Sequence, residues 1–154
     1  MGENDPGVVF AGFGEPLLRV DTLLDTVNLV KEEQNGVPFR INTNGLFFDD
    51  DDVITKLLDS GLVAVGDDDM RRETRIQSIS VFLPSNNAAT YAEIMQPPEG
   101  KSLLDAIGFI ASLAEAGVHV ECTAVEHPAV DLALTENLAM ALGASSFRTR
   151  TYHR

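Results

Sequence analysis

Short apolar runs alternate along this chain with amphipathic helical segments, and glycines or polar turns separate most neighbours. The apolar runs are rich in β-branched and aromatic residues, which is typical of buried strands, whereas the other segments place apolar residues at helical spacing. We predict strands over 8–11, 37–42, 62–65, 77–83, 118–125 and 146–150. We predict helices within 21–36, 53–61, 87–95, 102–117 and 132–142, with Asp21, Asn87 and Ser102 as N-caps. This β–α alternation predicts an α/β domain with parallel strands, outer helices and right-handed crossovers.

Polar turns follow several of the predicted strands, at 12–16, 42–45, 80–87 and 126–128. In parallel α/β folds, binding sites form at the carboxyl ends of the strands. We therefore expect these turns to converge on one face and to form a site there.

The first of these turns is Gly-Phe-Gly-Glu-Pro, over 12–16. Its glycines allow a tight turn and a close approach of a ligand, while Pro16 fixes one backbone angle and stiffens the turn. The turn thereby holds Glu15 at the carboxyl end of the predicted strand, where its carboxylate is able to accept hydrogen bonds from a ligand ammonium group. The alternative is a glutamate at a helix start that complements the helix dipole.

Length and charge limit the classes of function. The chain has 154 residues and a net charge of −13, with 24 acidic and 11 basic residues. We expect one domain that binds neither nucleic acid nor anionic membranes, because both need a basic surface. No apolar run reaches the length of about 18 residues that a membrane span needs. The acidic, polar start over 1–5 is unlike a secretory signal, so we expect a cytoplasmic protein.

The metal-binding side chains are few and scattered. Cys122 is the single cysteine, and one thiol holds neither an iron–sulfur cluster nor a structural zinc by itself. The acidic run 49–52 is typical of a helix start, with metal binding as the alternative. His119, His127 and His153 lack a metal-ligand spacing. We predict no metal site.

The segment 66–76 interrupts the alternation. It is polar, mixed in charge and without apolar periodicity, so we expect a disordered insertion that leaves the sheet.

Five stretches together resemble the radical S-adenosylmethionine enzymes, and in particular the subgroup encoded beside or fused to TatD-type nucleases. They are VVFAGFGEPLL (8–18), FRINTNGL (39–46), TYAEIMQPPEGK (90–101), the stretch 108–126, and FRTRTYH (147–153). The resemblance implies that residues 1–154 form a partial (β/α)6, TIM-like barrel with a parallel sheet and outer helices. The segment 66–76 interrupts what is a single strand in that family.

The resemblance also implies a cofactor site. The turn 12–16 is similar to the family's Gly-Gly-Glu-Pro element, which contacts the methionyl amino group of S-adenosylmethionine. The implied cofactor-binding residues are Gly12, Gly14, Glu15, Pro16, Thr43, Asn44, Ser80 and Glu126. Each later position has a simpler alternative: Thr43–Gly45 as a turn, Ser80 as an outward strand residue, and Glu126 as a loop cap.

The chain departs from the family at the iron–sulfur cluster. The family's Cys-x-x-x-Cys-x-x-Cys loop, which binds a [4Fe-4S] cluster, is absent from these residues, as is the first strand of the barrel. We therefore expect a barrel truncated at its N-terminus, with an unpaired sheet edge beside 8–11, and inactive as this fragment.

The complete enzyme implied by the resemblance cleaves S-adenosylmethionine reductively to a 5′-deoxyadenosyl radical that acts on an unknown small molecule, with a TatD-type nuclease as a possible partner. Two alternatives stay open. One is a non-catalytic α/β remnant that acts as a small-molecule or protein binding module. The other is an unrelated parallel-barrel enzyme, although no carboxylate pair in the sequence stands clear of helix surfaces.

Overall fold

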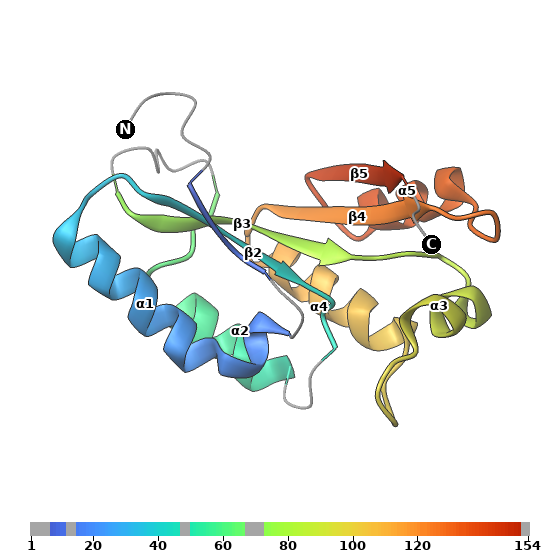
Figure 1. Ribbon diagram of the computed structural model, residues 1–154, viewed down its shortest axis with the longest axis horizontal. Helices are drawn as coiled ribbons and strands as arrows, with labels where there is room; N and C mark the ends of the chain where they lie inside the picture. Colours follow the sequence, from blue (N-terminus) through green and yellow to red (C-terminus); the bar gives the residue numbers. More distant parts are fainter. Residues whose placement is uncertain (1–6, 12–14, 47–49, 67–72, 152–154) are drawn as a thin grey trace.

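A parallel five-stranded sheet forms the centre of the molecule, with its strands in chain order, β1-β2-β3-β4-β5 (Figure 1). The computed structural model describes residues 7–11, 15–46, 50–66 and 73–151. The strands are β1 (Val8–Phe10), β2 (Pro38–Thr43), β3 (Arg75–Phe82), β4 (Val120–Glu126) and β5 (Ser146–Thr151). Every neighbouring pair is parallel, which confirms the predicted α/β class. Within the described ranges β1 and β5 do not pair with each other, so the sheet is open there.

One short 3-10 helix and five α-helices connect these strands in the described ranges. They are η1 (Pro16–Arg19), α1 (Val20–Glu33), α2 (Asp50–Asp59), α3 (Ala88–Met95), α4 (Leu103–Glu115) and α5 (Leu132–Ala141). Asn87 caps α3, and Ser102 caps α4 in a capping box with Asp105, as predicted for both caps. The prediction of Asp21 as an N-cap is wrong. Glu15 caps η1 instead, and the chain continues from η1 directly into α1.

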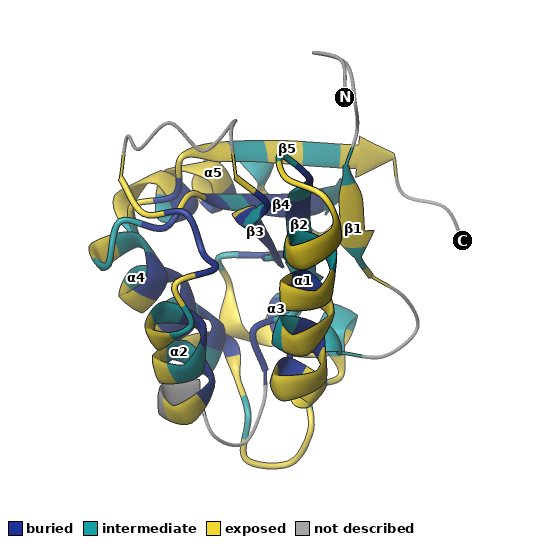
Figure 2. Cartoon of the chain, turned by 90° about the vertical axis from the view of Figure 1, so that its left-hand side faces the viewer, coloured by how far each residue is buried: buried dark blue, intermediate teal, exposed yellow. Residues whose placement is uncertain are grey.

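The helices pack against one face of the sheet. In Figures 1 and 2, α1, α2 and α4 lie on the same side of the strands. The core joins four helices to the three central strands, through Val27, Leu57, Ile110, Ala139, Ile41, Ile79, Val120 and Cys122. Because strand side chains alternate between faces, the residues between these core positions lie on the opposite face. No helix in the described part of the chain is long and apolar enough to span a membrane.

The predicted strand 62–65 is not a strand of the sheet. Its backbone makes a single bridge, between Val63 and Ile76. Ala64 N–H donates to the Ile76 carbonyl at 2.8 Å, and Ile76 N–H donates to the Leu62 carbonyl at 2.7 Å. From Ile79 onward that side of β3 is occupied by β4, so no further pairing positions remain.

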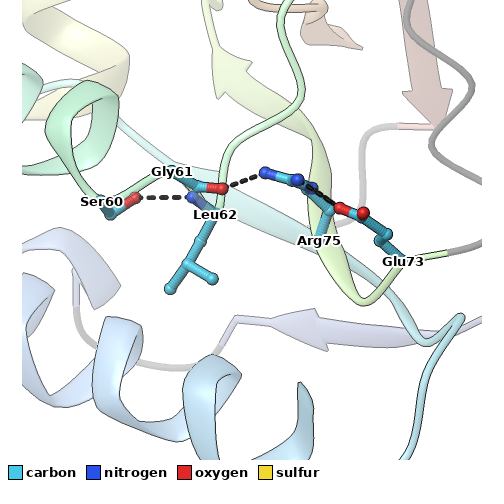
Figure 3. Close-up of polar contacts among 5 residues, drawn as sticks. All are labelled: Ser60, Gly61, Leu62, Glu73 and Arg75. Carbon is cyan, nitrogen blue, oxygen red and sulfur yellow. Dashed lines mark hydrogen bonds and ion pairs between the residues drawn. The ribbon is translucent and has the colours of Figure 1, made fainter. Parts of the chain in front are cut away.

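The polar segment predicted over 66–76 is shorter than expected. Figure 3 shows the Arg75 guanidinium between the Gly61 carbonyl and the Glu73 carboxylate, hydrogen-bonded to both. These contacts fix the entry of the chain into β3, which begins at Arg75. The predicted boundary at Ile76 is therefore wrong.

Thr74 and Ile76 are fully buried, which explains that boundary. The Thr74 hydroxyl donates to the Gln34 carbonyl at 2.6 Å and accepts from Val37 N–H at 3.1 Å. A lone buried hydroxyl between two backbone groups has no periodic signature in the sequence. Residues 67–72 of the predicted insertion lie outside the described residues.

Candidate functional site

The Glu15 carboxylate joins the turn after β1 to the turn after β2. It accepts hydrogen bonds from Leu17 N–H at 3.2 Å, from Asn44 N–H at 2.9 Å and from the Thr43 hydroxyl. The two strand-end turns therefore meet, as the sequence predicted. Glu15 also caps η1, which confirms the interpretation of this residue as a glutamate at a helix start.

Burial and hydrogen bonding act on Glu15 in opposite directions. Burial raises the pKa of the Glu15 carboxyl above its ordinary value, and the bonds from Asn44, Thr43 and Leu17 offset only part of this effect. A carboxylate offers about four acceptor positions, so three donors leave it able to accept one more hydrogen bond. Contact with a ligand ammonium stays a prediction.

The stretch Thr43–Gly45 forms the turn that its composition indicated. Gly45 N–H donates to the Thr43 hydroxyl oxygen at 3.1 Å, and Leu46 N–H donates to Asn44 Oδ1 at 2.8 Å. Gly45 has φ +71°, and a Cβ there would lie 3.2 Å from the Phe109 ring, so the turn requires glycine. The Asn44 side-chain oxygen is thus used within the turn, while its backbone N–H faces Glu15.

An open hollow lies beside this junction, and its empty space of about 320 Å³ includes open solvent. It is lined by Asn42, Thr43, Ser80, Phe82, Thr123, Arg148 and Arg150. These residues come from β2, β3, β4 and β5, so the hollow crosses four adjacent strands. Sheet alternation places most of them on the face that the helices leave uncovered.

Glu121 organises the polar side chains on that face. Its carboxylate pairs with the Arg148 guanidinium at 3.1 Å and accepts from the Ser80 and Ser146 hydroxyls at 3.4 and 3.3 Å. Ser80 therefore lies on the uncovered face of its strand and lines the hollow, and it is buried there. Its predicted contact with a cofactor stays a prediction.

The predicted site residues separate into three groups. Glu15, Thr43 and Asn44 lie together, with Pro16 as the first residue of η1, and Thr43 and Ser80 line the same hollow. Glu126 is exposed at the carboxyl end of β4 and does not line that hollow. The predicted residues Gly12 and Gly14 lie outside the described residues, as does His153.

Sequence reasoning missed four polar residues of this site: Glu121, Thr123, Arg148 and Arg150. They occupy every second position of β4 and β5. That alternation was the available signal. It marks one face of each strand, but it does not tell which face the helices cover.

The cysteine of this chain does not fit an iron–sulfur cluster. Cys122 is fully buried in the core, and burial raises the pKa of its thiol to about 12. A cluster is held by several thiolates, whereas this side chain is a neutral thiol shielded from solvent. In the described ranges no group of three or more His, Cys, Asp or Glu residues is placed to hold a metal.

The acidic run predicted as a helix start does begin a helix. α2 starts at Asp50, and Asp52 pairs with Lys56 one turn later at 3.3 Å. This pairing is that of a solvated helix face. Asp49 lies outside the described residues.

Comparison with known proteins does not identify this chain: no family model matches it, and no curated protein matches it. Its function is therefore argued from the geometry of the site and from the sequence resemblance.

Proposed function

We propose that this chain is a radical S-adenosylmethionine-type domain that binds the methionyl end of S-adenosylmethionine at the junction of Glu15, Thr43 and Asn44. The observation that carries the proposal is the meeting of these three residues at the carboxyl ends of β1 and β2. Two separate stretches of the resemblance supply them. A half-buried carboxylate with one free acceptor position suits an ammonium group, because charge-assisted hydrogen bonds are the strong ones.

The winding of the sheet supports the same proposal. Doubly wound sheets reverse their strand order at a switch point, whereas barrels add each strand beside the previous one. The order here is consecutive, and β1 lies at an edge. We accordingly propose that the sheet is a partial (β/α)6 barrel, with its uncovered face as the inner face.

Different residues of this chain would contact different parts of the cofactor. Glu15 would accept from the ammonium group, and the Ser80 hydroxyl would bond the ribose or the carboxylate. The backbone of Gly12 and Gly14 would contact the methionyl end of the cofactor, and Glu126 would lie on its adenine side. When bound in a complete enzyme of this type, S-adenosylmethionine supplies a 5′-deoxyadenosyl radical. Our proposal for these 154 residues is limited to binding and orienting that molecule, with a further small molecule as substrate and a TatD-type nuclease as partner.

A second candidate function is a non-catalytic binding module for a small molecule. The observation that favours it is the buried, neutral Cys122, which does not fit a cluster. This second candidate is free of the cofactor, so the two candidates differ in ligand as well as in chemistry.

Calorimetric titration with S-adenosylmethionine tests the first candidate. Glu15→Gln should weaken binding at least about tenfold, which is ~1.4 kcal/mol. Glu32→Gln, on the exposed surface of α1, is the matched control and should bind like the wild type. Melting curves of all three proteins establish that each is folded at the titration temperature. Equal affinities for the wild type and Glu15→Gln, or no binding by the wild type, would overturn the proposal.

A further inference from the structure

The uncovered face of the sheet has a charge opposite to that of the whole chain. The net charge is −13, with 11 basic residues, yet alternation places Arg40, Arg148 and Arg150 on this one face. Glu121 is the acidic residue that the described strands place beside them, and it pairs with Arg148. Arg40 Nε is buried without a hydrogen-bond partner in the described ranges. Positive charge on this face is therefore only partly neutralised.

Arg148 and Arg150 differ in their contacts with acidic side chains. Glu121 holds Arg148 by one guanidinium nitrogen, which orients the planar group and leaves its other donors available. Arg150 lines the same hollow. None of the ion pairs between described residues involves Arg150. Because the two residues are separated by one position on β5, both lie on the same side of that strand.

We propose that this hollow binds the anionic group, a carboxylate or a phosphate, of a small polar molecule between Arg148 and Arg150. The planar guanidinium matches both anions with paired N–H donors. The Thr123 hydroxyl and the Asn42 amide line the same hollow and supply further donors. The proposal does not rest on Glu15 or on the proposed cofactor.

The lining of the hollow limits the class of molecule that suits it. Phe82 is the one aromatic lining residue, and the others are polar. A molecule with one anionic group and several hydroxyl or amide groups matches this lining.

The test is an NMR titration of the ¹⁵N-labelled full chain with sodium phosphate and, separately, with sodium malonate. Sodium chloride at matched ionic strength is the reference. Either phosphate or malonate should shift the amide signals of 121–123 and 148–150 saturably, and chloride should not. Arg150→Gln should weaken that binding about tenfold, because it removes a charge-assisted donor. No response beyond that to chloride for both anions, or equal affinity of the wild type and Arg150→Gln, would overturn the proposal.

Arg19→Gln is the matched control, since it removes the same charge from an exposed position in η1. It should bind the anion like the wild type, and an equal loss with this variant would show that only net charge is sensed. Arg150 is exposed, so its substitution should leave the fold intact. Thr123→Val is a second variant that weakens the site without changing charge.

Repeating the titration with S-adenosylmethionine present separates this proposal from the proposed function. Anion affinity should be unchanged, because the anion belongs to a different molecule. Competition would assign the arginines to the cofactor's own carboxylate and overturn the separate site. If S-adenosylmethionine does not bind at all, the proposed function fails while the anion titration alone still decides this one.

Discussion

Hydrogen bonding and burial shift the pKa of the Glu15 carboxyl in opposite directions. Three donors favour the charged form, and burial favours the neutral form more strongly, so the pKa is raised. A raised pKa in the folded state means that the folded protein retains a proton longer than the unfolded chain as pH rises. The stability that Glu15 contributes is therefore present below its ordinary pKa and is lost as pH rises through the folded-state pKa.

We expect this pH dependence to appear as a difference between the wild type and Glu15→Gln. The wild type should lose stability relative to the variant as pH rises above 4.5, the ordinary pKa of the carboxyl group. Chemical unfolding of both proteins at each pH measures it, because the variant retains every other titrating group. A difference that is flat, or that grows in favour of the wild type, would contradict the role of burial.

Single residues were predictable from the sequence where a turn required them. Glu15, Thr43 and Asn44 stood in glycine-containing turns after apolar strands, so their convergence followed from topology. Arg148 and Arg150 stood inside a strand, where charged residues usually indicate a solvated face. Only the packing of the helices shows that this face is hollowed.

At the scale of elements, Thr74 is buried just before β3, so we expect its substitution to destabilise the protein. Thr74→Val removes the hydroxyl that links the Gln34 carbonyl and Val37 N–H, both in the connection from α1 to β2. We expect a loss of about 1–3 kcal/mol in the free energy of unfolding, since buried groups are left unpaired. Urea unfolding measures it.

Thr22→Val is the control for this substitution, because Thr22 is exposed on α1. It should change stability by no more than about 0.5 kcal/mol. Equal effects of the two variants would show that Thr74 lies in a solvated loop, as the sequence alone predicted.

Five of the six predicted strands fall on strands of the sheet, and the edge strands β1 and β5 are among them. The predictions for 37–42, 77–83 and 118–125 fall on β2, β3 and β4. The run 62–65 has the same apolar composition and is buried through Ala64, but it meets only the first residues of β3. Apolar character predicts burial, whereas strand pairing also needs an unoccupied neighbour.

For the whole molecule, the open sheet leaves β1 as an edge strand. Val8 and Val9 are 43% and 38% exposed, and β1 pairs with β2 alone in the described ranges. Unpaired edges with apolar residues recruit other strands. We expect self-association that increases with concentration, measurable by analytical ultracentrifugation.

Val9→Lys should reduce this self-association, because a lysine on an edge strand opposes strand addition. Val65→Lys is the control, since Val65 has a similar exposure of 41% and is in the segment that follows α2. A wild type that stays monomeric at all concentrations would contradict this expectation.

For the whole molecule, the net charge does not describe every surface. The excess of acidic residues predicts that the chain avoids nucleic acid, and that prediction concerns the average surface. The register of β4 and β5 nevertheless gathers arginines on one face. Composition therefore limits the partners of the outer surface and not the ligand of the hollow.

The central claim is that the junction of Glu15, Thr43 and Asn44 binds S-adenosylmethionine. Amide chemical-shift mapping of the labelled chain with this molecule tests its location most directly. The account predicts that the Leu17 and Asn44 signals shift most, since both N–H groups donate to the Glu15 carboxylate. The Gly66 and Gly117 signals, from the opposite end of the sheet, should stay unchanged. Shifts confined to that opposite end, or no shifts at all, would contradict the account.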